Sequence, residues 1–350
     1  MRKIISLIMV ITMVVTVFTG CTTNESQKED RTKETIQDNH EVSLEDDKEE
    51  ESVETITIKV AAPAGAPTLS MIKMFKEEPD FGENIEVIYE TVKSPDLMAS
   101  RVVSQEVDIA VVPTNLAASL YNREVNYKIA ASTVWGILYV VGNEPLNEIE
   151  GLKGETIYTM GRGLTPDIIL RYVLSNNGID PDTDVNLNYM GEASELASTF
   201  IAGNSDITLI PEPALSNIMI NKEDTKIVLD LQEEWSKIND SDTAYPQASL
   251  IIKNEIIEDY PEFIEAFLNE YNNSILWLED NVEIAGEYSQ ALETGLSKDA
   301  VINGLSRSNI EYKSMQESKE ALETYLNILF EYSPEVIGGK LPDENFYFEQ

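Results

Sequence analysis

The chain has 350 residues, of which 42% are hydrophobic, and a formal net charge of −38 at pH 7. A charge this negative argues against binding to nucleic acid or to anionic lipid headgroups. The single cysteine and the single histidine, Cys21 and His40, both precede the region that we expect to fold. This excludes a Ser-His-Asp or Cys-His catalytic site and an intramolecular disulfide, and we expect no catalytic residue, metal site or cofactor.

The first 20 residues have the order of a secretory signal peptide. Residues 1–3 begin with two positive charges, and residues 4–19 are apolar without a charge. As a helix this run would be about 24 Å long, shorter than the roughly 30 Å hydrocarbon core of a bilayer. Residues 17–21 (VFTGC) resemble the bacterial lipobox, with Phe18 where an aliphatic residue is usual. The resemblance implies cleavage before Cys21 and lipid attachment to it; an incidental cysteine in a secreted protein is the alternative.

The segment that follows, residues 21–54, is polar and mostly acidic. It has too few apolar residues to offset the entropy lost on folding, so we expect a disordered tether between the lipid and the fold. The rest of the chain is long enough for two domains.

From residue 55 the pattern alternates strands and helices, which is typical of an α/β fold with parallel sheets. Strands are expected where β-branched or apolar residues run between turns, and helices where apolar residues recur at helical spacing. The first unit is predicted as a strand at 55–62, a turn at 63–67, a helix through 71–75, a strand at 85–89, a helix at 95–105 and a buried strand at 108–112.

A second unit repeats this plan after residue 143. It is predicted as a strand at 155–160, a loop at 161–165, a helix at 166–177, a strand at 185–190, a helix at 194–202 and a buried strand at 207–210. A strand at 248–252 should return to the first lobe, and an amphipathic helix at 261–279 should follow. We therefore expect one lobe from residues 55–143 and 247–350, and another from residues 144–246.

Four loops follow predicted strands and are candidates for ligand contact. In open parallel sheets, ligands bind beyond the carboxyl ends of the strands. At least three of these loops lead into a helix N-terminus, where free N–H groups attract anions. The loop residues expected to touch a ligand are Pro63, Ala64, Gly65, Ala66, Thr114, Asn115, Arg162, Gly163, Leu164, Thr165 and Glu212. The alternative is that all four are ordinary connecting turns.

Some side chains suggest the chemistry of the ligand. Arg162 could pair with an anion through two hydrogen bonds, and Glu212 could accept one from an amine or a ring N–H. Each could equally be a solvated surface residue. Trp135, Tyr139 and Tyr245 are candidate stacking faces for a ring, although large aromatic side chains are more often part of a core.

The order and spacing of several motifs resemble the substrate-binding proteins of nitrate/sulfonate/taurine-type ABC transporters, a group that includes binders of pyrimidine precursors. The motifs are residues 58–67 (IKVAAPAGAP), 107–115 (VDIAVVPTN), 152–157 (LKGETI) with 163–167 (GLTPD), and 206–213 (DITLIPEP). The likeness extends over roughly residues 55–335. It implies a type II periplasmic-binding-protein fold, in which two α/β lobes with a central cleft are joined by two hinge strands.

The resemblance also implies a function. We expect an extracytoplasmic protein, lipid-anchored to the outer face of the cell membrane, that captures a small organic solute and delivers it to the permease subunits of an ABC importer. The solute should be anionic, zwitterionic or a nitrogen heterocycle, contacted by the loops named above. We expect a monomer without a nucleic-acid partner.

Two other functions remain open at this point. Cytoplasmic dehydratases of menaquinone synthesis and yeast-type pyrimidine synthases look similar, so an enzyme on the same fold is the main rival. The pyrimidine synthases rely on a histidine and pyridoxal phosphate, and residues 55–350 contain no histidine. The lipobox argues against a cytoplasmic enzyme. The third possibility is the ligand-binding module of a sensor.

Overall fold

The computed structural model of the protein describes residues 55–146 and 148–349. The expected signal peptide, Cys21 and the acidic segment 21–54 lie outside the described residues, so those expectations remain predictions.

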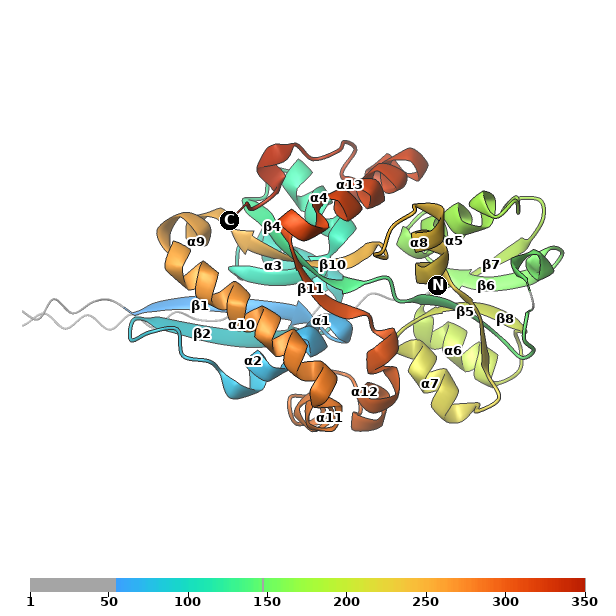
Figure 1. Ribbon diagram of the computed structural model, residues 1–350, viewed down its shortest axis with the longest axis horizontal. Helices are drawn as coiled ribbons and strands as arrows, with labels where there is room; N and C mark the ends of the chain where they lie inside the picture. The colour runs from blue at the N-terminus through green and yellow to red at the C-terminus, as the bar shows by residue number, and fades with distance from the viewer. Residues whose placement is uncertain (1–54, 147, 350) are drawn as a thin grey trace, which may run out of the picture. The chain divides into compact units, whose positions relative to one another are not determined.

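The first sheet has six strands, and Figure 1 shows their arrangement. They are β1 (Ile56–Pro63), β2 (Ile85–Val92), β3 (Ile109–Pro113), β4 (Tyr127–Trp135), β10 (Pro246–Lys253) and β11 (Ile310–Ser314). The spatial order is β11-β4-β10-β3-β1-β2. β1 runs parallel to β2 and β3, whereas β10 is antiparallel to β3 and β4, and β11 is antiparallel to β4.

The second sheet has five strands. They are β5 (Leu138–Gly142), β6 (Thr156–Met160), β7 (Asn186–Met190), β8 (Ile207–Pro211) and β9 (Lys226–Asp230), in the order β7-β6-β8-β5-β9. β6 is parallel to β7 and β8, and β5 is antiparallel to β8 and β9. Two α/β lobes confirm the predicted fold class, but both sheets are mixed and not parallel as expected, because β10 and β11 in the first sheet and β5 in the second run antiparallel to their neighbours.

Helices cover both sheets. The α-helices are α1 (Ala66–Ser70), α2 (Ile72–Glu77), α3 (Pro95–Val103), α4 (Thr114–Asn122), α5 (Thr165–Asn176), α6 (Ala193–Ile201), α7 (Ala214–Asn221), α8 (Leu231–Ile238), α9 (Asn254–Asp259), α10 (Pro261–Asp280), α11 (Val282–Ala291), α12 (Lys298–Gly304) and α13 (Met315–Tyr332). Short 3-10 turns are η1 (Ile149–Leu152), η2 (Leu305–Arg307), η3 (Pro334–Ile337) and η4 (Glu344–Phe346).

The core of the first lobe lies on both faces of its sheet. Val60 and Ala62 on β1 belong to an apolar cluster with Phe267 of α10. Ala61, between them, belongs to a second cluster with Met98 of α3 and residues of α13. Successive side chains of a strand point to opposite faces. The second half of β1, residues 60–63, is therefore apolar and buried because both of its faces are covered, whereas Thr57 and Lys59 in the first half are exposed.

The chain passes twice between the sheets. The first crossing is residues 136–137, between β4 and β5. The expected change of lobe near residue 143 is therefore one strand too late, because β5 already pairs with β8 and β9 of the second sheet. The second crossing, residues 239–245, leads from α8 into β10 of the first sheet, close to the expected return near residue 247.

Candidate functional site

The first crossing is tightly packed. A Cβ atom on Gly136 would lie 2.6 Å from Cγ of Gln232 and 2.7 Å from the ring of Tyr245. The Gln232 side-chain oxygen accepts hydrogen bonds of 2.9 Å from the Leu138 N–H and from the Tyr245 hydroxyl. Glycine is thus required at position 136 by close approach, and Gln232 ties the two crossings together.

Tyr245 lies in an aromatic cluster rather than in an open stacking position. It is fully buried, stacks on Tyr325 of α13 at 5.7 Å, and meets Trp235 of α8 edge-on at 5.2 Å. The Tyr325 hydroxyl lies 3.4 Å from Oγ1 of Thr165. Burial raises the pKa of both tyrosine phenols, so they stay protonated at neutral pH. The structure therefore brings Thr165 and Tyr245 together, with Tyr325 from the other lobe as the contact between them.

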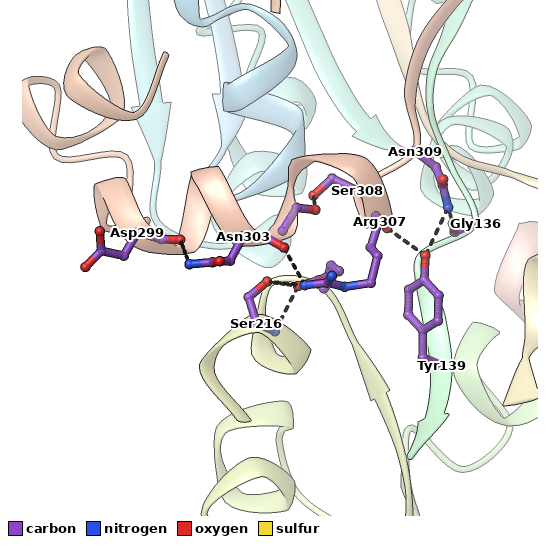
Figure 2. A network of polar contacts seen from close by, with 10 residues as sticks. Gly136, Tyr139, Ser216, Asp299, Asn303, Arg307, Ser308 and Asn309 are labelled. Carbon is purple, nitrogen blue, oxygen red and sulfur yellow. Dashed lines mark hydrogen bonds and ion pairs between the residues drawn. The ribbon is translucent and has the colours of Figure 1, made fainter. Parts of the chain in front are cut away.

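Glu212 is 2% exposed and is occupied by other protein groups. One carboxylate oxygen accepts a hydrogen bond from Nε of Arg307 at 2.6 Å. The other accepts from the backbone N–H and the hydroxyl of Ser216, at 3.1 and 2.8 Å. Arg307 also donates through Nη2 to Oγ of Ser216 at 3.1 Å and to the Asn303 carbonyl at 2.7 Å (Figure 2). In this arrangement, neither oxygen of Glu212 is left without a partner from the protein.

The loop before α5 is held by its own contacts. The Gly163 N–H donates to Oδ2 of Asp167 at 2.7 Å, and the Leu164 N–H donates to the Gly161 carbonyl at 2.7 Å. The Leu164 side chain is 54% exposed. Gly163 has φ +73°, and a Cβ there would meet nothing within 4 Å. Two of the N–H groups expected to bind an anion therefore donate within the loop. The space that a side chain of residue 163 would occupy is empty.

Arg162 is exposed in the same loop. Its guanidinium lies 4.1 Å from the centre of the Tyr189 ring, a cation–π contact. Tyr189 in turn donates to the buried carboxylate of Asp167 at 2.6 Å. Among the described residues, Arg162 contacts Tyr189 and Glu212 contacts Arg307, so the two charged residues expected at one solute have different partners.

The loop after β1 is held by hydrogen bonds at both ends, but there is empty space beside Gly65. The hydroxyl of Thr68 donates to the Pro63 carbonyl at 2.8 Å, and the Ala64 N–H donates to Val92 at 2.8 Å. Gly65 has φ +103°, and a Cβ there would meet nothing within 4 Å. Ala66, the first residue of α1, is 5% exposed. As at Gly163, a small molecule could approach the backbone here.

Thr114 and Asn115 point to different places. Oγ1 of Thr114 lies 2.8 Å from Oγ of Ser249 on β10. The side chain of Asn115 donates instead to the Val336 carbonyl in η3, at 3.4 Å. Asn115 thus contacts the C-terminal segment. Thr114 pairs its hydroxyl with that of Ser249 at the end of β3.

Sequence reasoning missed several polar groups near these strand ends. Ser132 of β4 is paired across the sheet with Ser249, is fully buried, and has no hydrogen-bond partner for its hydroxyl among the described residues. Thr159 of β6 and the Gln247 side-chain oxygen of β10 also have none there. A buried polar atom without a partner costs about 1–3 kcal/mol. No sequence signal singled these residues out, because their strands contain other polar residues, such as Lys128 of β4 and Thr156 of β6. Their missing partners mark these atoms as candidate ligand contacts.

A groove of about 1150 Å³ lies along the crossings on surfaces from both lobes. Of the predicted residues, it includes Trp135, which is 3% exposed and donates through Nε1 to the Glu311 carbonyl at 3.0 Å. Its charged lining residues are Asp230, Glu233, Lys237, Asp242, Glu279 and Glu311. Burial raises the pKa of the Asp230 carboxyl. The groove is separate from the four predicted loops and carries mostly negative charge.

Residues 55–146 and 148–349 contain no group of three or more His, Cys, Asp or Glu residues arranged to hold a metal ion. In the same part of the chain, no helix is both long and apolar enough to cross a membrane.

Comparison with known proteins gives the family. A family model described as "Menaquinone biosynthesis" matches residues 58–331. The chain belongs to this family. No curated protein sequence is significantly similar to it.

Solved structures resemble this member of the menaquinone biosynthesis family over most of its length. An ABC transporter protein from Parabacteroides distasonis is 27% identical, with a TM-score of 0.72, over 84% of this chain and 99% of that one. The periplasmic aliphatic sulphonate binding protein SsuA from Escherichia coli is 12% identical (TM-score 0.66; 84% and 92% covered). The periplasmic nitrate-binding protein NrtA from Synechocystis is 15% identical (TM-score 0.55; 81% and 84% covered). The last two likenesses concern the fold alone.

Proposed function

We propose that the protein is an extracytoplasmic solute-binding protein of an ABC importer. The observation that carries this proposal is the likeness to the Parabacteroides distasonis ABC transporter protein, which covers 99% of that chain at 27% identity. The two lobes and their two crossings agree with it, because a solute bound between lobes can be enclosed by their relative movement.

The solute site in this proposal lies at the strand ends that face the other lobe. Gly65 and Gly163 leave open space beside the backbone, and the Ser132 hydroxyl is buried without a partner among the described residues. Arg162 supplies an exposed positive charge in the loop before α5. These groups suit a small anionic or zwitterionic molecule, or a nitrogen heterocycle, that accepts hydrogen bonds. Glu212 is reassigned from solute contact to its pairing with Arg307.

The location and partners follow from the same proposal. The lipobox-like residues around Cys21 would place the protein on the outer face of the cell membrane, anchored by lipid, where it would deliver solute to permease subunits. The chain would act as a monomer. A binding module that feeds a sensor would use the same site, and the genes adjacent to this one would distinguish the two roles.

An enzyme is the second candidate, and the family match over residues 58–331 favours it. Residues 55–350 contain no histidine or cysteine, so such an enzyme would depend on carboxylates or on neutral hydrogen-bonding groups. The likeness to the Parabacteroides distasonis ABC transporter protein, at 27% identity over 99% of that chain, favours binding instead. The binding function is therefore preferred.

A thermal-shift screen tests the proposal. The full chain is heated with nitrate, sulfonates, pyrimidines, flavins and amino acids, each over a range of concentrations. A true solute raises the melting temperature progressively, since binding stabilises the folded state by about 2.7 kcal/mol at 100 times the Kd. The expected result is a response to one chemical class. Uniform failure with these classes and with a deproteinised cell extract would contradict a binding function.

A further inference from the structure

A short segment that is part of neither sheet joins the two lobes. It consists of α12 and η2, residues 298–307. On one side, Val301 is 1% exposed and belongs to an apolar cluster with Leu69, Ile72, Leu278 and Ala285 of the first lobe. This side of the segment is fixed to the first lobe by buried apolar surface.

The other side of the segment meets the second lobe through polar contacts. Arg307 pairs with Glu212 at the end of β8 and with Ser216 of α7. The Tyr139 hydroxyl of β5 donates to the Arg307 carbonyl at 2.9 Å, and the Asn309 side chain donates to the Gly136 carbonyl (Figure 2). Burial raises the pKa of the Tyr139 phenol, which keeps it a donor. The segment is therefore bound to the second lobe by an ion pair and hydrogen bonds beside the first crossing.

Close approach accompanies these contacts. A Cβ atom on Gly304 would lie 3.4 Å from Cβ of Ser216 and 3.4 Å from Oε2 of Glu212, and it would overlap the Ser216 hydroxyl. The absence of a side chain at position 304 thus lets α12 lie directly against α7. A glycine inside a helix lowers stability by about 1 kcal/mol relative to alanine. The close contact with α7 explains why position 304 is nevertheless a glycine.

The two sides of the segment differ in how readily they separate. Pulling Val301 from its cluster would expose apolar surface to water, at about 25 cal/mol for each Å². Separating Arg307 from Glu212 would instead return two charges to water, and their hydration offsets much of the lost attraction. A movement of the lobes would therefore break the polar side and leave the apolar side intact.

We propose that Arg307, Glu212 and Ser216 form a latch that holds the two lobes in the arrangement seen here and releases when they separate. The latch goes beyond the proposed function and does not depend on which solute is bound. It also gives Glu212 a role that its position at a strand end did not suggest.

A distance measurement between the lobes tests the latch without a ligand. Ser100 on α3 and Ser198 on α6, which are both exposed, are each replaced by a ketone-bearing residue that carries a nitroxide label. Pulsed electron–electron double resonance then measures the distance between the two labels. The full chain is used with Cys21→Ala, so that no native thiol remains. Wild type should give one short distance, while Glu212→Gln and Arg307→Met should raise the ratio of long to short distances roughly tenfold or more.

Arg171→Met is the matched control. Arg171 pairs with Asp167 in α5 and with Asp182, so both of its ion pairs lie within the second lobe. The Arg171 and Asp167 side chains are 21% and 4% exposed, against 21% and 1% for Arg307 and Glu212. Removing that pair should leave the distance between the lobes unchanged. An equal effect of Arg171→Met and Arg307→Met would mean that general destabilisation, rather than the latch, separates the lobes, and the proposal would be wrong.

A disulfide provides a rescue. Ser216→Cys with Gly304→Cys places the two Cβ atoms about as far apart as in a disulfide, 3.4 Å against a usual range of about 3.5–4.5 Å. When oxidised, this pair should return Arg307→Met to the short distance, and reduction should undo the rescue. The proposal is overturned if Glu212→Gln and Arg307→Met both match wild type, if wild type already shows the long distance, or if the oxidised pair fails to restore the short one.

Discussion

Tyr325 of the first lobe packs against aromatic side chains at the second crossing and in the second lobe. It is fully buried, and it lies 5.7 Å from Tyr245 with nearly parallel rings and 6.1 Å from Trp235 edge-on. Tyr325 and Tyr245 belong to the apolar cluster that includes Leu322 of α13 and Leu138 of β5. Its ring should therefore matter more to stability than its hydroxyl.

Substitutions at Tyr325 separate these two contributions. Tyr325→Ala should lower the free energy of unfolding by about 3–5 kcal/mol, because a large buried ring is removed. Tyr325→Phe should cost less than about 1 kcal/mol, because the hydrogen-bond distance from this hydroxyl to Thr165 is long, 3.4 Å. Urea denaturation of both variants measures the difference. If Phe costs as much as Ala, the hydrogen bond and not the packing holds this contact.

Sequence patterns found several residues at the right strand ends but could not pair them. Thr165 and Tyr245 were both expected near a ligand, yet their meeting depends on Tyr325, which lies 160 positions after Thr165. Glu212 was expected to contact solute, but its partner Arg307 is 95 positions away in a segment of no evident periodicity. Local spacing carries no information on such pairs, because the tertiary fold alone brings them into contact.

At the scale of elements, α13 begins with a capping box. The Glu317 carboxylate accepts hydrogen bonds from the hydroxyl and the backbone N–H of Ser314, at 2.7 and 3.0 Å. These two hydrogen bonds lower the pKa of Glu317 below its ordinary value. A carboxylate with a lowered pKa in the folded state contributes stability above its unfolded pKa, and that contribution is lost as the pH falls through the folded pKa.

Two substitutions test this cap. Ser314→Ala should lower the free energy of unfolding by about 1 kcal/mol at pH 7. Glu317→Gln should be destabilising at pH 7. Its difference from wild type should shrink on acidification, as the pH falls through the folded pKa of Glu317 and the wild-type carboxylate takes up a proton. Urea denaturation over a series of pH values from 7 downward measures this. Glu320→Gln, an exposed change in the same helix, is the control, and an equal pH dependence of the two Gln variants would contradict the cap.

The elements that sequence patterns predicted are those with clear turns on both sides. The strands expected at 55–62, 108–112, 207–210 and 248–252 are present as β1, β3, β8 and β10. Residues 127–142 had no evident turn, and they form β4 and β5 in different sheets with only residues 136–137 between them. β9 and β11 were also missed, because each is a five-residue edge strand that carries charged residues.

At the scale of the whole molecule, two sheets are joined by two crossings, and two further contacts span the lobes. The aromatic contact around Tyr325 and the polar contact around Arg307 lie on different helices, α13 and η2. Such an arrangement suits a protein whose lobes move about the crossings as a solute enters and leaves. The family match leaves an enzymatic use of the same fold as the rival.

The most direct test of the solute-binding function is native mass spectrometry of the full chain with the molecule found by thermal shift. We expect one solute bound to each chain, released on denaturation with its mass unchanged after prolonged incubation. An enzyme of the menaquinone biosynthesis family would instead release a product of different mass, for example a substrate that has lost water. Recovery of such a product in amounts exceeding the protein would contradict the account.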